Sequence, residues 1–397
     1  MEMKNTEKIS GLIITAELFL LIALSLIFFN REEGRESVAE NRRLAPFPTI
    51  REEDGSVSMT LGEDLKAWFE DNLGLRDAYL TISGVLNYNL FGRAKTGKVE
   101  LGSDDFLYLA EEGNLSLETS KSEEFVDKIP EYASDQQKIA DKLASQGIDY
   151  VLMIGPGKPS VYPEYIRSSS HVVEETIGDA LSGYLKENTD VHVSWPKQDL
   201  IGAKDNAENE LIYLKTDTHW TTYGRYIAYE DLLKDLSDWG IADVKPCEVR
   251  YYKSEEPYYG DLAGMMGPVT WSGEVLKEKD FTDWEVVSPK AEVVDKGERY
   301  EAFKAMMYEK NVYNPELCAM FHNDSAEDMS VLVCGDSMVG ICLLPQLAEC
   351  FSDLTFVWSY SLDQEIIDFV KPDLVISEFG ERELRLRMDS IREFAGE

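Results

Sequence analysis

The chain has 397 residues, of which 44% are hydrophobic and 29% charged, and 75 acidic against 39 basic side chains give a formal net charge of -36. This composition is typical of a folded protein with a sizeable core and excludes a disordered chain. So negative a surface repels phosphate backbones, which argues against nucleic-acid binding.

The N-terminal region contains a run of apolar residues, Gly11–Phe29, interrupted only by Thr15, Glu17 and Ser25. A helix of this length crosses roughly 30 Å of hydrocarbon. No small-x-small cleavage site follows, so the pattern predicts an uncleaved signal-anchor. Basic residues lie on both sides of the span, but the short head favours a cytoplasmic segment 1–10 and an extracytoplasmic remainder. Glu17 either contacts another membrane protein or reaches water near the helix end.

Three further regions follow the predicted span. Residues 30–95 are expected to form a juxtamembrane linker and amphipathic helices, because apolar side chains recur at helical spacing between Leu65 and Leu75. Residues 96–397 are expected to form one large domain. Within it, residues 247–327 are rich in Tyr, Gly and charge without a clear period, which predicts a long insertion.

Short apolar runs alternate with helical patterns throughout the predicted domain. Expected strands are Tyr150–Gly155, Val191–Trp195, Val331–Gly335, Leu354–Trp358 and Asp373–Ser377. Expected helices are Ser134–Gln146, Val173–Glu187, Thr222–Trp239 and Met338–Phe351. This alternation predicts an α/β fold with a mostly parallel sheet flanked by helices on both faces.

Neither a metal nor a nucleotide cofactor is expected. The five cysteines, an odd number, lack zinc-site spacing and are interpreted as small buried hydrophobes. The sequence has neither a P-loop nor a GxGxxG motif.

Ser337 is a candidate nucleophile, because it follows the apolar run Val331–Gly335 at the start of a predicted helix. Ligands of open α/β sheets bind at the carboxyl ends of strands, and backbone amides there can stabilise an oxyanion. A serine hydroxyl needs a base, and His219 is the candidate, with Asp217 as its orienting partner. Alternatively, "DTHW" is a packed loop before a helix capped by Thr221 or Thr222, and "GDS" is an ordinary turn.

"KTDTHWTTYG" resembles the signature of the DHHW family, and the chain resembles the SGNH-hydrolase-like O-acetyltransferases of the alginate acetylation type. Other similar stretches are "ENRRLAPFP", "WFEDNLGLRD", "VELGSDDFLYL", "GPGKPSVYPEY" and "PDLVISEFGERELR". The Asp-x-His pair precedes the serine, which is the permuted motif order of this family. The sequence departs from the family pattern at Thr218, where a second histidine is common, and no asparagine is assigned as an oxyanion donor.

The resemblance implies a triad of Ser337, His219 and Asp217 without a cofactor. Arg382 is either a substrate contact or part of a structural ion pair. Lys158 and Tyr162 either line the cleft or anchor a loop, and Trp220 either packs under the triad or forms a sugar platform.

The implied function is extracytoplasmic O-acetylation of a cell-surface polysaccharide through an acyl-serine intermediate. The implied partners are the polysaccharide and a multi-spanning membrane O-acyltransferase that donates acetyl groups. Two alternatives stay open: an acetylesterase with the same triad, and a non-catalytic scaffold of a polysaccharide export complex.

Overall fold

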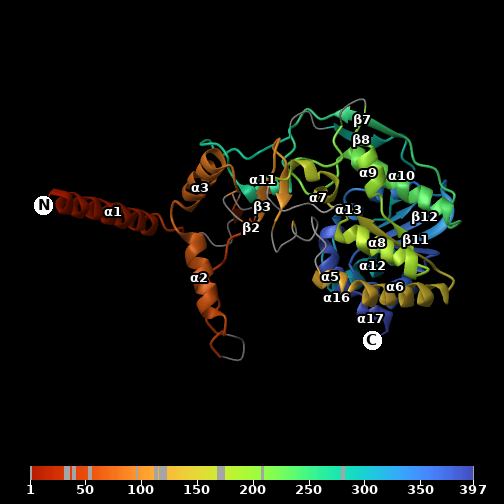
Figure 1. Ribbon diagram of the computed structural model, residues 1–397. Helices are drawn as coiled ribbons and strands as arrows, with labels where there is room; N and C mark the ends of the chain where they lie inside the picture. The colour runs from red at the N-terminus through yellow and green to blue at the C-terminus, as the bar shows by residue number, and fades with distance from the viewer. Residues whose placement is uncertain are drawn as a thin grey trace. The chain divides into compact units, whose positions relative to one another are not determined.

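The computed structural model describes residues 2–30, 36–37, 42–51, 56–94, 97–110, 115, 123–167, 175–206, 210–278 and 282–396 (Figure 1). The chain divides into two compact units. Unit 1 comprises residues 1–99 and 261–276, and unit 2 comprises residues 100–260 and 277–397. The predicted insertion is therefore shared between the two units, because its residues 261–276 belong to unit 1.

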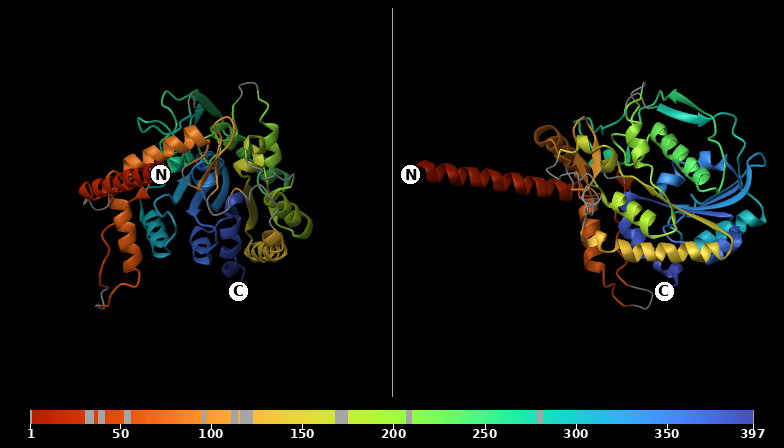
Figure 2. Two further views of the ribbon diagram at one scale, coloured as in Figure 1. Left: turned by 60° about the vertical axis from the view of Figure 1, so that its left-hand side comes forward. Right: turned by 45° about the vertical axis from the view of Figure 1, so that its right-hand side comes forward.

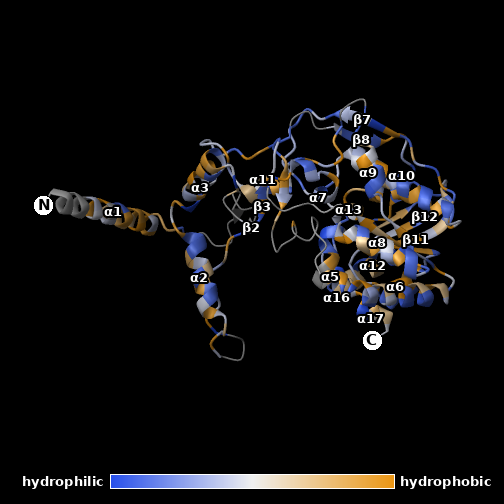
Figure 3. Ribbon diagram, in the orientation of Figure 1, coloured by the Kyte–Doolittle hydropathy of each residue, from blue (hydrophilic) through white to orange (hydrophobic). Residues whose placement is uncertain are grey.

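Unit 1 is mainly helical, with α1 (Glu2–Ile27), α2 (Leu61–Asn72), α3 (Arg76–Phe91), α11 (Asp261–Met266) and the short pair β1 (Glu36–Ser37) and β2 (Arg42–Arg43). Within the described ranges, one helix is long and apolar enough to cross a membrane, through its window Ser10–Ile27. Figure 3 shows the hydrophobic colouring of this part of α1. The window overlaps the predicted span, and the helix itself begins further upstream, at Glu2.

Unit 2 is built on a seven-stranded sheet in the order β6-β5-β13-β11-β12-β10-β9. The first five strands, β6 (His192–Ser194), β5 (Asp149–Gly155), β13 (Leu374–Gly380), β11 (Glu327–Gly335) and β12 (Phe351–Trp358), run parallel. The last two, β10 (Ala319–His322) and β9 (Glu292–Val293), are antiparallel additions at one edge. Two two-stranded sheets lie outside this sheet, β3 (Val99–Leu101) with β4 (Leu107–Leu109) and β7 (Val249–Lys253) with β8 (Thr282–Val286).

Helices cover both faces of the sheet (Figure 2). They are α5 (Glu123–Val126), α6 (Ile129–Ala144), α7 (Lys158–Val161), α8 (Ile177–Asn188), α9 (Lys197–Gly202), α10 (Thr222–Asp238), α12 (Glu298–Glu309), α13 (Ser337–Gly340), α14 (Leu344–Ala348), α15 (Gln364–Val370), α16 (Leu384–Ser390) and α17 (Arg392–Ala395), with 3-10 turns at η2 (Pro163–Tyr165) and η3 (Glu381–Glu383). Alternate strand residues face opposite sides. Leu152 and Leu332 join the core under α6 and α8, whereas Val151 and Val333 join the core under α10. The α/β prediction is confirmed.

One predicted helix is wrong in its extent. Met338–Phe351 is not continuous but forms α13 and α14, separated by a turn, and Phe351 already belongs to β12. A Cβ on Gly340 would lie 2.5 Å from the Phe356 ring. Glycine therefore allows the end of α13 to pack directly against β12, and the chain turns there.

Candidate active site

Three neighbouring parallel strands end in glycine at the same edge of the sheet: Gly155 on β5, Gly380 on β13 and Gly335 on β11. Gly380 and Gly155 pair directly. A Cβ on Gly335 would lie 2.6 Å from Oε2 of Glu378, so a side chain does not fit there. This edge, formed by carboxyl ends of parallel strands, is where α/β proteins bind ligands.

Ser337 lies at this edge, at the start of α13, and is 9% exposed. Asp336 caps the helix by accepting from Met338 N at 2.8 Å through Oδ1. Its other oxygen, Oδ2, accepts from Gly380 N at 3.0 Å. Because one carboxylate joins the turn to the neighbouring strand, the position of Ser337 is fixed relative to the sheet.

The candidate base lies on a tight loop that precedes α10. Leu214 N donates to His219 O at 3.3 Å, and Thr221 N donates to Ile212 O at 2.9 Å, so the segment folds back on itself. Thr221 then caps α10 by accepting from Gly224 N at 3.0 Å. A packed loop with a capping threonine and an Asp–His pair were alternative interpretations of this stretch. The structure shows that one loop has both features.

Asp217, His219 and Ser337 form a continuous hydrogen-bonded chain. Asp217 Oδ1 lies 2.6 Å from His219 Nδ1, and His219 Nε2 lies 2.8 Å from Ser337 Oγ. With the proton on Nδ1 donated to the carboxylate, Nε2 is free to accept the serine proton. The three groups come from two loops 118 residues apart.

A fourth side chain, Tyr258, extends this chain of contacts. Its hydroxyl donates to Asp217 Oδ2 at 2.8 Å. Tyr258 is paired through backbone hydrogen bonds with Glu278, whose carboxylate accepts from Thr216 N and Thr216 Oγ1 at 2.8 and 2.9 Å. Sequence reasoning missed both residues, because they lie in the Tyr-rich stretch without periodicity and no local motif marks them.

Three of the predicted substrate contacts are buried structural residues. Trp220 is fully buried and so cannot act as a sugar platform. Lys158 is 3% exposed, and its ammonium donates to the carbonyls of Leu214, Lys215 and Asp217 at 2.6–3.1 Å. Tyr162 is also buried and accepts from Ile212 N at 3.0 Å through its hydroxyl. Lys158 and Tyr162 therefore hold the loop of His219 in place.

Arg382 lies closer to the predicted cleft. It lines a hollow of about 10 Å³ together with Thr218, Met338 and Gly380, room for about one water molecule. Its Nε lies 3.3 Å from the carboxylate of Glu383. The ion pair and the place beside the cleft are both present, so each of the two roles expected for Arg382 has a structural basis.

A buried carboxyl group, Glu378, lies directly beneath the serine turn. Its Oε2 accepts from Asp336 N at 3.1 Å. Its Oε1 is buried and has no hydrogen-bond partner among the described residues. Burial raises the pKa of Glu378 well above its ordinary value, and the nearby Asp336 carboxylate raises it further. Glu378 is therefore neutral under conditions where an exposed glutamate is charged.

The comparison with protein families agrees with this architecture. The family described as "SGNH hydrolase-like domain, acetyltransferase AlgX" matches residues 99–299, about half of the chain. The chain belongs to this family. The matched range of the SGNH hydrolase-like domain contains Asp217 and His219 but ends before Ser337, so the serine is identified by geometry.

Individual relatives of this SGNH-like protein are distant. It is 28% identical over 200 residues to a probable alginate O-acetylase AlgJ of Pseudomonas fluorescens. The matched residues cover 49% of this chain and 47% of the relative. It thus spans about half the length of the curated relatives it matches. The structure of Bacillus cereus PatB1 with a sulfonyl adduct is 13% identical with a TM-score of 0.50, covering 72% of this chain and 97% of the other. A DHHW family protein from Eubacterium siraeum is 14% identical with a TM-score of 0.46, covering 66% and 89%.

Proposed function

We propose that this protein transfers acetyl groups onto hydroxyls of a polysaccharide through an acetyl-Ser337 intermediate. The single observation that carries the proposal is the hydrogen-bonded series Asp217–His219–Ser337 at the carboxyl edge of the sheet. Membership of the acetyltransferase AlgX family supports acetyl transfer. The relatives named as probable alginate O-acetylases support a polysaccharide acceptor.

In the first half-reaction, His219 Nε2 removes the proton from Ser337 Oγ, and Oγ attacks the carbonyl carbon of the acetyl donor. Asp217 stabilises the imidazolium that forms. The tetrahedral intermediate then collapses, and the leaving group departs with the proton from His219. The product is an acetyl ester on Ser337.

In the second half-reaction, a sugar hydroxyl gives its proton to His219 Nε2 and attacks the acetyl carbon. Ser337 leaves as the alkoxide and recovers the proton. The negative charge of both tetrahedral intermediates needs hydrogen-bond donors, and the backbone N–H of Ser337 is our candidate for one of them. Arg382 is our candidate for contacting the acceptor, because it lines the hollow beside Met338 and Gly380.

We further propose that α1 anchors the protein in a membrane with the catalytic unit outside the cytoplasm. The apolar window Ser10–Ile27 supports the anchor. Acetyl-CoA is absent outside the cell, so this placement requires a membrane protein that delivers acetyl groups, for which a multi-spanning O-acyltransferase is our candidate.

The test is a transfer assay with the purified full chain, an activated acetyl ester as donor and a neutral oligosaccharide as acceptor. We expect acetylated oligosaccharide from the wild type and a loss of about 10⁴-fold in Ser337→Ala, because the hydroxyl forms the covalent bond. Ser325→Ala, at an exposed serine, is the matched control.

Two outcomes would contradict the proposal in different ways. Release of free acetate alone, unchanged by any oligosaccharide, would indicate an esterase that uses the same three residues. Full transfer activity in Ser337→Ala would exclude the acyl-serine mechanism.

A further inference from the structure

Helix α3 of unit 1 has an unusual composition for so acidic a protein. Residues 78–98 contain no Asp or Glu, and their only charged side chains are Arg93, Lys95 and Lys98. The rest of α3 beyond Asp77 is apolar or uncharged polar. Against a net charge of -36 for the whole chain, the composition of this segment is locally basic and apolar. Basic residues beside an apolar segment attract the anionic headgroups of a bilayer.

The apolar residues of α3 that face solvent fall on one stripe. Ile82, Leu86 and Leu90 are spaced by four residues and are 43%, 38% and 68% exposed. Phe91, at the end of the helix, is 64% exposed. The opposite side packs inward through Gly84 and Val85. The helix therefore presents a continuous apolar face that the described residues of unit 1 do not cover.

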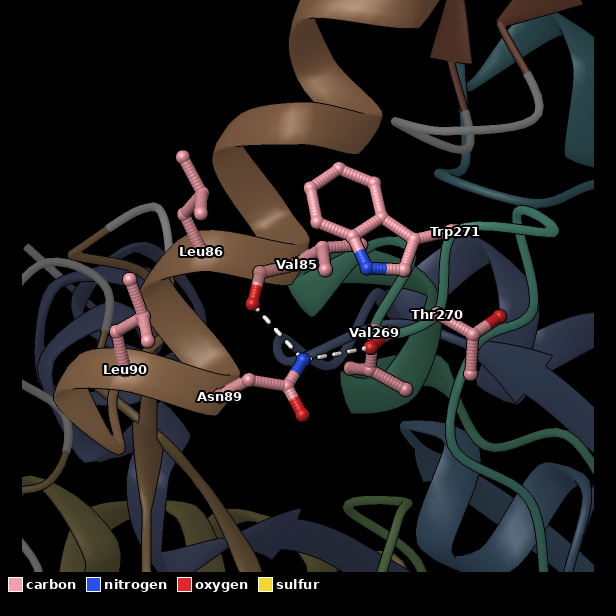
Figure 4. A pocket seen from close by; sticks show the side chains of 7 residues that line it. All are labelled: Val85, Leu86, Asn89, Leu90, Val269, Thr270 and Trp271. Carbon is pink, nitrogen blue, oxygen red and sulfur yellow. Dashed lines mark hydrogen bonds between the residues drawn. The ribbon is translucent and has the colours of Figure 1, made fainter.

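An exposed tryptophan continues this face. Trp271 is 68% exposed and lies at the tip of a turn closed by Gly273 N to Thr270 O at 3.1 Å and by Val269 N to Glu274 O at 2.8 Å. Trp271, Leu86 and Leu90 line a pocket of about 420 Å³ between the turn and α3 (Figure 4). An aromatic ring with a polar N–H is the side chain that membrane interfaces favour.

The Trp271 turn is firmly attached to the helix. Asn89 Nδ2 donates to Val269 O at 3.0 Å and to Val85 O at 2.9 Å, as Figure 4 shows. A Cβ on Gly84 would lie 2.4 Å from Pro268 O, so glycine permits the close approach of the turn. The exposed tryptophan is thus held beside α3 by specific contacts and is not a loose loop residue.

The end of α1 lies against the start of α3. Gly74 N donates to Ser25 O at 2.9 Å, and Ser25 Oγ contacts Tyr79 OH at 3.3 Å. Asn30 N donates to Asn72 O at 2.8 Å. The apolar window of α1 ends at Ile27. If α1 spans a bilayer, these contacts bring the start of α3 to the level of the headgroups.

We propose that α3 and the Trp271 turn dock on the surface of a bilayer that contains anionic phospholipid. Leu86, Leu90 and Trp271 enter the boundary between headgroups and acyl chains, and Arg93, directly after α3, contacts the anionic headgroups. The proposal rests on the membrane anchor of the proposed function and is independent of the serine chemistry. Its physical basis is continuity with the apolar α1 and charge complementarity with the lipid.

The test uses the full chain reconstituted in vesicles of equal parts phosphatidylcholine and phosphatidylglycerol, with bromine on the phosphatidylcholine chains. Bromine quenches tryptophan fluorescence at short range. We expect a quenched component in the wild type that is lost in Trp271→Phe and kept in Trp239→Phe, which replaces a tryptophan of unit 2. Leu90→Glu should also remove it, whereas Val293→Glu, at an exposed position of unit 2, should not.

Each contrary result has one meaning. If the vesicles are separated by flotation and the protein does not float with them, the membrane anchor is contradicted. The transfer assay is unaffected by that result. Inserted protein whose quenching is identical in the wild type and Trp271→Phe would overturn the docking proposal and leave the face to a protein partner. Equal quenching in vesicles of phosphatidylcholine alone would overturn the role of anionic lipid.

Discussion

At the scale of single residues, Tyr258 is the clearest addition to the predicted triad. Its hydroxyl donates to the one oxygen of Asp217 that does not contact the His219 ring. A hydrogen bond to a charged group contributes about 1.5–3 kcal/mol. This bond fixes the orientation of the carboxylate and, through it, of the imidazole, so Tyr258 is a positioning residue.

Tyr258→Phe should therefore lower kcat roughly 10-fold with KM unchanged, because the hydroxyl orients the base and does not touch the substrate. The measurement is steady-state acetyl transfer, with thermal unfolding to show that the variant is folded. Tyr252→Phe is the matched control, since Tyr252 is exposed and its hydroxyl donates to Asp283 Oδ2 at 3.4 Å. A higher KM with normal kcat would instead assign Tyr258 to substrate binding.

Asp217, His219 and Ser337 were predictable because two local signals coincide with the family resemblance. These signals are a strand-to-helix turn for the serine and a short Asp-x-His spacing before a helix. Lys158 and Tyr162 carry no signal that separates a cleft residue from an internal anchor. Only the fold shows that the ammonium of Lys158 is turned inward to three carbonyls. Of the two roles expected for Lys158 and Tyr162, lining the cleft or anchoring a loop, these contacts match the loop anchor.

At the scale of elements, β13 contributes more to the site than its apolar sequence indicates. It places Glu378, fully buried, beside the turn that carries Ser337. The strand itself was predictable from "DLVIS", because buried parallel strands are continuous apolar runs. The raised pKa of Glu378 was not predictable from the sequence, because β11 and the Asp336 turn create the environment of its carboxyl group.

Glu378 should make stability depend on pH. Its pKa is raised in the folded state, so above about pH 4.5 the unfolded chain releases a proton that the folded chain retains. The folded state therefore loses stability as pH rises, by up to about 1.4 kcal/mol per pH unit until the folded pKa is reached. Glu378→Gln removes this dependence, because the amide does not titrate.

The measurement is denaturant unfolding of the wild type and Glu378→Gln between pH 5 and pH 8. We expect the variant to gain free energy of unfolding relative to the wild type as pH increases. The exposed Glu187→Gln is the control. A difference between wild type and Glu378→Gln that stays constant with pH would mean that the carboxyl has the same protonation in the folded and unfolded chain.

At the scale of the whole molecule, the order of elements was more predictable than their grouping. The alternation of apolar runs and helical patterns predicted the parallel sheet, since its five parallel strands each carry a strong local signal. The antiparallel edge strands β9 and β10 and the membership of residues 261–276 in unit 1 depend on contacts between distant segments. Such contacts leave no periodic pattern in the local sequence. For this reason no helices or strands could be predicted within the expected insertion.

The net charge of -36 is also a property of the whole molecule. Long-range repulsion slows the approach of a strongly anionic acceptor, and salt screens that repulsion. This repulsion is the reason for using a neutral oligosaccharide in the transfer assay.

The proposed mechanism requires Ser337 to carry the acetyl group between donor and acceptor. The most direct measurement is mass spectrometry of the protein quenched in acid during turnover with the acetyl donor and no acceptor. We predict one added acetyl group on the peptide that contains Ser337, lost when oligosaccharide is added before quenching. An unmodified Ser337 peptide under conditions where acetyl transfer proceeds, or an acetyl group on a different residue that turns over instead, would contradict the account.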